Sequence, residues 1–161
     1  MTAEEVREIS KEIFGEPKEP ISLKDFITKT NDTEFNKSKG IEVLDEDARL
    51  LGNWLRPHVK CGNGFKISIQ ASKMHYCIPR ESCRDSYESY EICLFENVTE
   101  EALEKLLKST KNKKQKKAIQ YVLDEISMDT VIGYIPHDTL QSFLDACGGI
   151  MEICNTNFKL R

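Results

Sequence analysis

The sequence predicts a single α+β domain with a small, mainly antiparallel sheet of three or four strands, covered by about five or six helices. The chain has 161 residues, the length of one domain that buries roughly two thirds of its unfolded surface. Segments with apolar residues at every second position are interspersed with segments that have them at helical spacing. Their order predicts an N-terminal helical region (about residues 1–60) packed on a strand and helix core (about 65–154).

The N-terminal region is predicted to be mainly helical. Thr2 and Glu5 form a capping box that begins a first helix with apolar residues at helical spacing. A linker with two prolines follows, because each proline disfavours helix in the residue before it. Ser22 then caps a short second helix. Residues 28–40 have few apolar side chains and are predicted to form a loop.

The centre of the chain changes from helical to strand periodicity. Acidic residues can cap a helix over about 45–55, and a turn is predicted at 61–64. Residues 65–71 alternate between apolar and polar, which predicts a half-buried strand, and a second strand is predicted over about 89–95. Residues 73–87 between them are too many for a tight hairpin and are expected to form a structured loop.

The C-terminal half alternates between helices and strands. Thr99 caps a helix, and apolar residues at helical spacing predict another over about 118–126. A third strand is predicted at 131–135, and Pro136 opens the next helix. Residues 150–154 are predicted to form a last strand or a strand-like tail. These elements complete a sheet with helices packed against it.

Composition excludes several classes of protein. Hydrophobic residues make up 39% and charged residues 31% of the chain, which is typical of a folded domain rather than a disordered one. No stretch reaches the roughly 18 apolar residues that span a bilayer, so no membrane association is expected. The first five residues are acidic and polar, unlike a secretory signal. We therefore expect the protein in the cytoplasm.

The six cysteines are predicted to be free thiols. An even number would suggest disulfide bonds in a secreted chain, but disulfides rarely persist in a reducing compartment. The cysteines are Cys61, Cys77, Cys83, Cys93, Cys147 and Cys154.

Two closely spaced pairs, His58 with Cys61 and His75 with Cys77, are candidate metal ligands. A tetrahedral zinc site takes four nitrogen or sulfur ligands, often in two such pairs, and Cys83 can replace one of them. The spacings match no standard zinc finger or ribbon, so buried thiols and hydrogen-bonded imidazoles explain the same residues. No metal or other cofactor is expected, and the zinc site is kept as an alternative.

Cys77 is also the candidate nucleophile of a thiol enzyme. A thiolate–imidazole pair with His75 or His58, oriented by Asp85, has the residue types of this chemistry. No family signature surrounds Cys77, and a structural cysteine beside a loop is the simpler interpretation. The sequence lacks a phosphate-binding loop, a nucleophile elbow and a paired-histidine helix. The prediction is therefore a protein that is not an enzyme, with no catalytic residues.

Charge is distributed unevenly along the chain, although the net charge is only −4. Residues 1–50 carry 13 acidic and 8 basic side chains, and residues 81–104 carry 8 acidic side chains with Arg84 as the one base. Residues 51–80 carry five bases and no acid. Residues 105–117 carry no acid and seven lysines: Lys105, Lys108, Lys111, Lys113, Lys114, Lys116 and Lys117.

The lysine run is a candidate surface for a nucleic acid or a nucleoprotein, because lysines that neutralise phosphates release counterions. Its predicted binding residues are Lys111, Lys113, Lys114, Lys116 and Lys117. A solvated loop kept open by mutual repulsion explains the run equally well. The run contains no aromatic residue and no arginine, which argues against a platform for stacking bases.

The acidic zone is a candidate surface of the opposite kind. Carboxylates spread over a loop and a strand can imitate a track of phosphates and occupy the nucleic-acid groove of a partner. An ordinary polar strand face beside a charged helix start explains them too. The residues are Glu81, Asp85, Glu88, Glu91 and Glu96.

Two parts of the core resemble small uncharacterised proteins of bacteriophages and prophages. The first part is residues 67–72 (ISIQAS) followed by 75–80 (HYCIPR), and the second pairs 133–136 (GYIP) with 147–150 (CGGI). The resemblance covers about residues 65–150. It implies that the protein belongs to a mobile element and acts on host machinery, in the cytoplasm of the host. It implies no catalytic residues.

Small size, missing catalytic motifs, uneven charge and this resemblance together predict a non-enzymatic accessory protein that binds a host protein or nucleoprotein. An inhibitor of a nucleic-acid-handling defence system, such as a CRISPR effector, fits these features. The alternatives are a thiol- or zinc-dependent enzyme centred on Cys77 and His75, and a direct nucleic-acid binder acting through residues 105–117. The sequence leaves the partner and the oligomeric state open.

Overall fold

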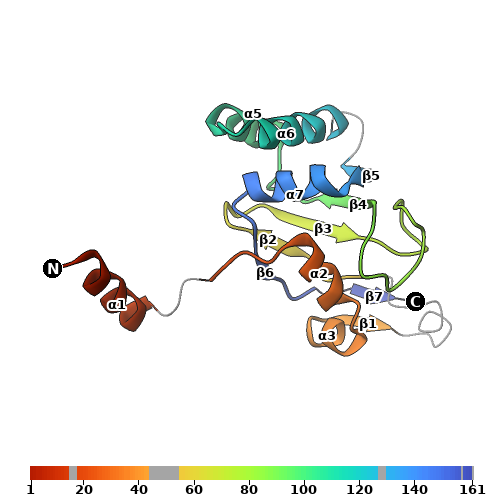
Figure 1. The fold of residues 1–161 in the computed structure, drawn as a ribbon. Coiled ribbons are helices and arrows are strands. Elements are labelled where there is room, and N and C mark those ends of the chain that lie inside the picture. Colours follow the sequence, from red (N-terminus) through yellow and green to blue (C-terminus); the bar gives the residue numbers. More distant parts are fainter. Residues whose placement is uncertain (15–17, 44–54, 127–129, 157, 161) are drawn as a thin grey trace.

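The structure is a computed structural model that describes residues 1–14, 18–43, 55–126, 130–156 and 158–160 (Figure 1). These residues form six helices, a five-stranded antiparallel sheet and a separate pair of short parallel strands. The predicted α+β class is confirmed.

The main sheet has the strand order β5-β4-β3-β2-β6, with every neighbouring pair antiparallel. β3 and β4 form its centre, and β5 and β6 form its two edges. The strands are β2 (Val59–Cys61), β3 (Lys66–Gln70), β4 (Ser89–Leu94), β5 (Val131–Pro136) and β6 (Ile150–Ile153).

Strand alternation builds an apolar face on this sheet. Ile67 is paired with Leu94, and Ile69 with Ile92, so side chains of the same character stand opposite each other on adjacent strands. All four are buried. The residues that alternate with them, Ser68 paired with Cys93 and Gln70 paired with Glu91, point to the opposite and more polar face. The apolar residues at every second position of β3 and β4 therefore determine which face of the sheet the helices cover.

Helices pack against the apolar face of the sheet and against one another. α7 (His137–Ala146) packs on the sheet and contacts β5, and α6 (Lys113–Ile126) packs on α7 with α5 (Glu100–Ser109) beyond it (Figure 1). α2 (Leu23–Thr30) lies beside α7, where the Leu23 amide donates to the Gln141 side chain at 2.8 Å.

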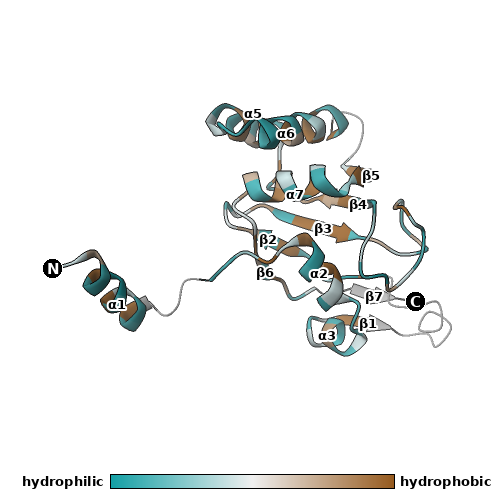
Figure 2. Ribbon diagram, viewed as in Figure 1, coloured by the Kyte–Doolittle hydropathy of each residue, from teal (hydrophilic) through white to brown (hydrophobic). Residues whose placement is uncertain are grey.

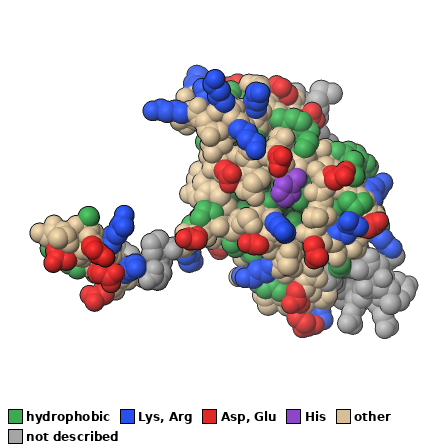
Figure 3. Space-filling model, viewed as in Figure 1, with side chains coloured by type: hydrophobic (Ala, Val, Ile, Leu, Met, Phe, Trp, Pro, Cys, Tyr) green, Lys and Arg blue, Asp and Glu red, His purple; other side chains and the backbone are tan. Residues whose placement is uncertain are grey.

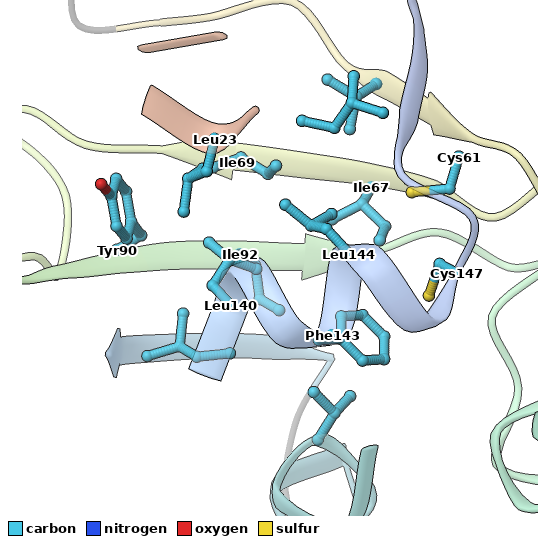
Figure 4. Packing of buried hydrophobic residues seen from close by; sticks show 14 of the residues in the cluster. Leu23, Cys61, Ile67, Ile69, Tyr90, Ile92, Leu140, Phe143, Leu144 and Cys147 are labelled. Atoms are coloured by element: carbon cyan, nitrogen blue, oxygen red, sulfur yellow. The ribbon is translucent and has the colours of Figure 1, made fainter. Parts of the chain in front are cut away.

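The core forms where α7 meets the strands. Leu140, Phe143 and Leu144 of α7 are fully buried. Leu140 lies by Ile92 and Leu144 by Ile67, while Phe143 points to the other side of α7 (Figure 4). Burying one side chain of this size contributes about 1.5–3 kcal/mol. The α7 residues recur at helical spacing and the strand residues at every second position, so both patterns meet in one core.

The stretch predicted as a loop, residues 28–40, is largely helical. It contains the end of α2 and all of α3 (Thr33–Ser38). Asp32 begins α3, because its carboxylate accepts hydrogen bonds from the amides of Glu34 and Phe35 (2.9 and 3.4 Å). A six-residue helix is too short to show an apolar period, so the prediction was wrong here.

Two further differences concern short elements. The sheet has five strands instead of three or four, because the three-residue β2 ends inside the predicted turn at 61–64. The two-stranded parallel sheet joins β1 (Ile41–Val43) to β7 (Phe158–Leu160), which were not predicted. The helix predicted over 45–55 falls almost wholly on residues outside the described ones.

α1 (Ala3–Phe14) lies apart from the rest of the molecule, whereas α2 packs on the core (Figure 1). The capping box is confirmed: the Thr2 amide donates to the Glu5 carboxylate (2.6 Å), and the Glu5 amide donates to the Thr2 hydroxyl (3.1 Å). Every side chain from residue 1 to 13 is exposed. Figure 2 shows that α1 nevertheless has hydrophobic as well as hydrophilic sides.

Arg56 joins α2 to the sheet from inside the core. Its side chain is fully buried, and its guanidinium donates to the Ile27 carbonyl (3.0 Å), the Thr30 hydroxyl (2.9 Å) and the Ala71 carbonyl (3.0 Å). The Gln70 side chain bonds both the amide and the carbonyl of Arg56 (2.8 and 2.9 Å). Burial lowers the pKa of Arg56, because the apolar surroundings disfavour its charge.

We predict that Arg56→Met lowers the free energy of unfolding by about 3 kcal/mol, because it leaves buried carbonyl groups without donors. Urea denaturation measures the change. Arg84→Met is the matched control, since Arg84 pairs with Glu81 on the surface (2.8 Å) and its loss should cost less than about 1 kcal/mol. Equal losses in the two variants would contradict the structural role of Arg56.

Candidate functional site

The structure holds Cys77 as a buried thiol. Its side chain is fully buried, and Sγ donates to the carbonyls of Ser72 (3.2 Å) and Pro79 (3.4 Å). Burial raises the pKa of Cys77, which disfavours the thiolate. The His75 ring bonds the Ser72 hydroxyl through Nδ1 at 2.6 Å. The Cys77 amide donates to the His75 carbonyl at 3.0 Å, but among the described residues no hydrogen bond joins the Cys77 thiol to a histidine ring, so the geometry lacks a thiolate–imidazole pair.

The structure does not bring the four candidate metal ligands together. His58 packs against Phe95 with ring centroids 4.4 Å apart and ring planes tilted by 53°. Cys61 lies beside Cys147, the residue that follows α7 (Figure 4). His75 and Cys77 both bond Ser72, His75 through the hydroxyl and Cys77 through the carbonyl, and neither bonds His58 or Cys61. Cys83, the possible replacement, is exposed on the surface. Over the part of the chain that the structure describes, no three His, Cys, Asp or Glu side chains are grouped so as to hold a metal ion.

The five acidic candidates have separate surroundings. Glu81 pairs with Arg84, and one carboxylate oxygen of Glu91 accepts the Tyr76 amide at 2.9 Å. Asp85 and Glu88 are exposed in the β3–β4 connection, and Glu96 follows the far end of β4. Two of the five carboxylates therefore serve contacts within the protein, and the set extends over the whole length of a strand.

The lysine run lies where α5 ends and α6 begins. All seven lysines are exposed, and Figure 3 shows blue side chains gathered at one end of this helical hairpin, at the top left of the view. Lys105 pairs with Glu101 at 3.7 Å, and within the described chain the other six form no ion pair. We call these six the lysine end: Lys108, Lys111, Lys113, Lys114, Lys116 and Lys117.

Four members of the lysine end stand on a helix rather than in a loop. The helix predicted from about residue 118 begins at Lys113, after Asn112, whose side chain accepts the Gln115 amide at 3.0 Å. The opposite side of α6 is anchored in the core through Ala118, Ile119 and Val122. The positive charges are therefore held on a packed scaffold, which a solvated loop would not provide.

The charges on α6 oppose its helix dipole. Lysines occupy its first turn, which contains no acid, while Asp124 and Glu125 lie near its C-terminal end. A helix N-terminus carries partial positive charge, so each lysine there destabilises the helix by about 0.3–1 kcal/mol. α5 has the favourable order, with Glu100 and Glu101 first and Lys108 last. Tolerating the cost in α6 indicates a use for positive charge at this place.

The structure also forms an exposed cluster that the sequence prediction missed. The rings of Tyr76 and Tyr134 lie 5.8 Å apart, the Arg80 guanidinium stands 5.6 Å from the Tyr76 ring, and the Tyr134 amide donates to the Tyr76 carbonyl at 2.9 Å. Met74 and Ile78 flank Tyr76 in the same loop and are half exposed. We call these five residues the aromatic patch. Four of its members lie at every second position from residue 74 to 80, and the fifth, Tyr134, comes from β5, so only the folded chain brings the two segments together.

Comparison of the chain with family models, with curated proteins and with solved structures finds no match. Within the described residues, no helix has the length and apolar character needed to cross a bilayer.

We predict that His58 makes stability depend on pH. Burial and, to a smaller extent, the charge of Lys66 together lower its pKa to about 4. The unfolded chain, with an ordinary pKa of about 6.5, binds a proton first, so stability present above pH 6.5 is lost as the pH falls toward 4. The expected loss is about 2 kcal/mol. Urea denaturation of wild type and His58→Gln should differ by this pH-dependent amount; parallel curves would contradict it.

We predict that the double variant Lys113→Glu, Lys114→Glu raises the free energy of unfolding by about 0.3–1 kcal/mol per residue, because acids suit a helix N-terminus. Lys108→Glu is the reciprocal control at the C-terminal end of α5, where the same change should lower stability. Chemical denaturation at low salt measures both. A destabilised double variant would show that these lysines stabilise the fold.

Proposed function

We propose that the protein is a non-enzymatic binding protein whose lysine end contacts the phosphate backbone of a nucleic acid held in a host nucleoprotein. One observation carries this proposal: six exposed lysines without ion pairs, within the described chain, gather at one end of a helical hairpin. Four of them stand on α6 in an order that its helix dipole disfavours.

Phosphate contacts explain the chemistry of this surface. Lysine ammonium groups neutralise phosphates as point charges, and the release of counterions drives the association. The lysine end holds no aromatic side chain and no arginine, so it lacks groups that stack on bases or form bidentate contacts with guanine. We therefore expect binding that depends strongly on salt and little on base sequence.

The resemblance to phage and prophage proteins supports a host complex as the partner. Defence complexes that carry a guide RNA or engage DNA, such as CRISPR effectors, expose the phosphates that the lysine end would bind. An accessory protein bound there would block access to nucleic acid. The five acidic candidates support a surface that imitates phosphates less well, because Glu81 and Glu91 already have partners within the chain. The thiol enzyme has less support still, since Cys77 is buried and bonded to carbonyls.

We predict that the wild-type chain binds a purified CRISPR effector loaded with its guide RNA, and free RNA more weakly, in a salt-dependent way. Changing Lys113, Lys114, Lys116 and Lys117 together to Ala should abolish binding, because it removes four phosphate contacts. Each lost contact also reduces the slope of log affinity against log salt concentration by about 0.7–0.9. Biolayer interferometry at several salt concentrations measures the affinities and slopes.

The control is a second quadruple variant with the same change in net charge, Lys18, Lys24, Lys37 and Lys60 to Ala, at exposed positions outside the lysine end. It should keep most of the affinity. Equal loss in the two quadruple variants would indicate a general charge effect. No binding to loaded effector or to RNA at low salt would reject the proposed function, and equal affinity for the two would favour direct nucleic-acid binding.

A further inference from the structure

α1 carries an apolar stripe that stays exposed in the part of the chain that the structure describes. Val6, Ile9 and Ile13 recur on one side of the helix and are 48%, 43% and 66% exposed. An isolated helix of 12 residues is marginal in water, and most helices of this length are stable because an apolar face is covered. The capping box of Thr2 and Glu5 favours the helix, but only docking elsewhere would bury the stripe.

The charge of α1 restricts what covers the stripe. The helix has four acidic side chains and two basic ones, Arg7 and Lys11, and its acidic residues are Glu4, Glu5, Glu8 and Glu12. Helices that lie on membranes carry a basic polar face, because cell membranes are anionic. Nucleic acid is anionic as well. The charge therefore points to a protein surface that is apolar and bears cations.

The aromatic patch of this same protein has these properties. Tyr76 and Tyr134 expose 53% and 44% of their surface, and tyrosine with arginine is the typical composition of the centre of a protein interface. Arg80 lies over the Tyr76 ring, and Lys73 is exposed beside Met74. Over the described residues neither of these two cations forms an ion pair, so both are free to face the carboxylates of α1.

The linker after α1 is too short to lay the whole helix on the aromatic patch of its own chain. The body of the chain begins at Ile21, which bridges to Ile150 on β6, whereas Tyr134 lies on β5 at the opposite edge of the sheet. Four strand intervals separate β6 from β5, about 19 Å. The seven steps from Phe14 to Ile21 span at most about 25 Å when fully extended. Crossing the sheet would use most of the length of a fully extended linker. Only the last turn of α1 would therefore reach the patch of its own chain.

We infer that two copies of the chain exchange their α1 helices, each laying its apolar stripe on the aromatic patch of the other in a symmetrical dimer. A twofold axis makes both contacts identical, so each unpartnered surface covers its counterpart on the second copy. Glu5 and Glu12 border the stripe and face Arg80 and Lys73 across the interface.

Sedimentation equilibrium of the full chain in the micromolar range tests this arrangement. Wild type is expected to be a dimer, and the double variant Ile9→Gln, Ile13→Gln should raise the dissociation constant at least about tenfold. The matched control, Glu8→Gln with Lys11→Gln, changes the opposite side of α1 and should leave the dimer intact. Tyr134→Asn removes the patch ring, and Asn tolerates the positive φ of 57° at this position.

Mixing the variants separates exchange from other modes of association. The α1 double variant keeps an intact patch, and Tyr134→Asn keeps an intact helix, so an equimolar mixture should form a heterodimer although neither variant dimerises alone. Unchanged urea midpoints establish that both variants are folded. A monomeric wild type, a dimer that persists in either variant, or a mixture without heterodimer overturns the inference.

Discussion

A buried charge holds the centre of this molecule in place. Arg56 has no exposed surface, and among the described residues its hydrogen-bond partners are carbonyls and a hydroxyl rather than a carboxylate. An arginine without water is tolerated only where acceptors stand at fixed positions around it. The C-terminal turn of α2 and Ala71, just after β3, supply them, so the guanidinium sets their relative position. The β3–β4 connection that carries Tyr76 starts directly after this anchor.

The two proposed surfaces lie at different places on the fold. The lysine end is at the N-terminal end of α6, and Tyr134 belongs to β5, which follows the other end of that helix. A helix of 14 residues is about 21 Å long, so the surfaces are separated by roughly that distance. Contact with phosphates and exchange of α1 therefore need not compete. A dimer would present two lysine ends, and two linked sites bind an extended anion more tightly than one.

Features that depend on near neighbours in the chain were predicted well. The capping residues Thr2, Ser22 and Thr99 each make the expected hydrogen bond, and the strand periodicity of 65–71 corresponds to β3. α3 and β2 were missed, because elements of six and three residues are too short to repeat a pattern. The lysine run was noticed in the sequence. The start of α6 within this run was not predicted, because lysines at a helix N-terminus oppose the helix dipole and therefore argue against a helix there.

The fold class and the main helices and strands could be predicted because they arise from interactions over a few residues, and the uneven charge can be read directly from the chain. Three features could not be predicted: the burial of Arg56, the bonding of the Cys77 thiol to carbonyls instead of a histidine ring, and the contact of Tyr76 with Tyr134. Such contacts join residues whose distance along the chain carries no information about their distance in space. They follow from the register of the strands and the packing of α7 on them, which only the folded chain establishes.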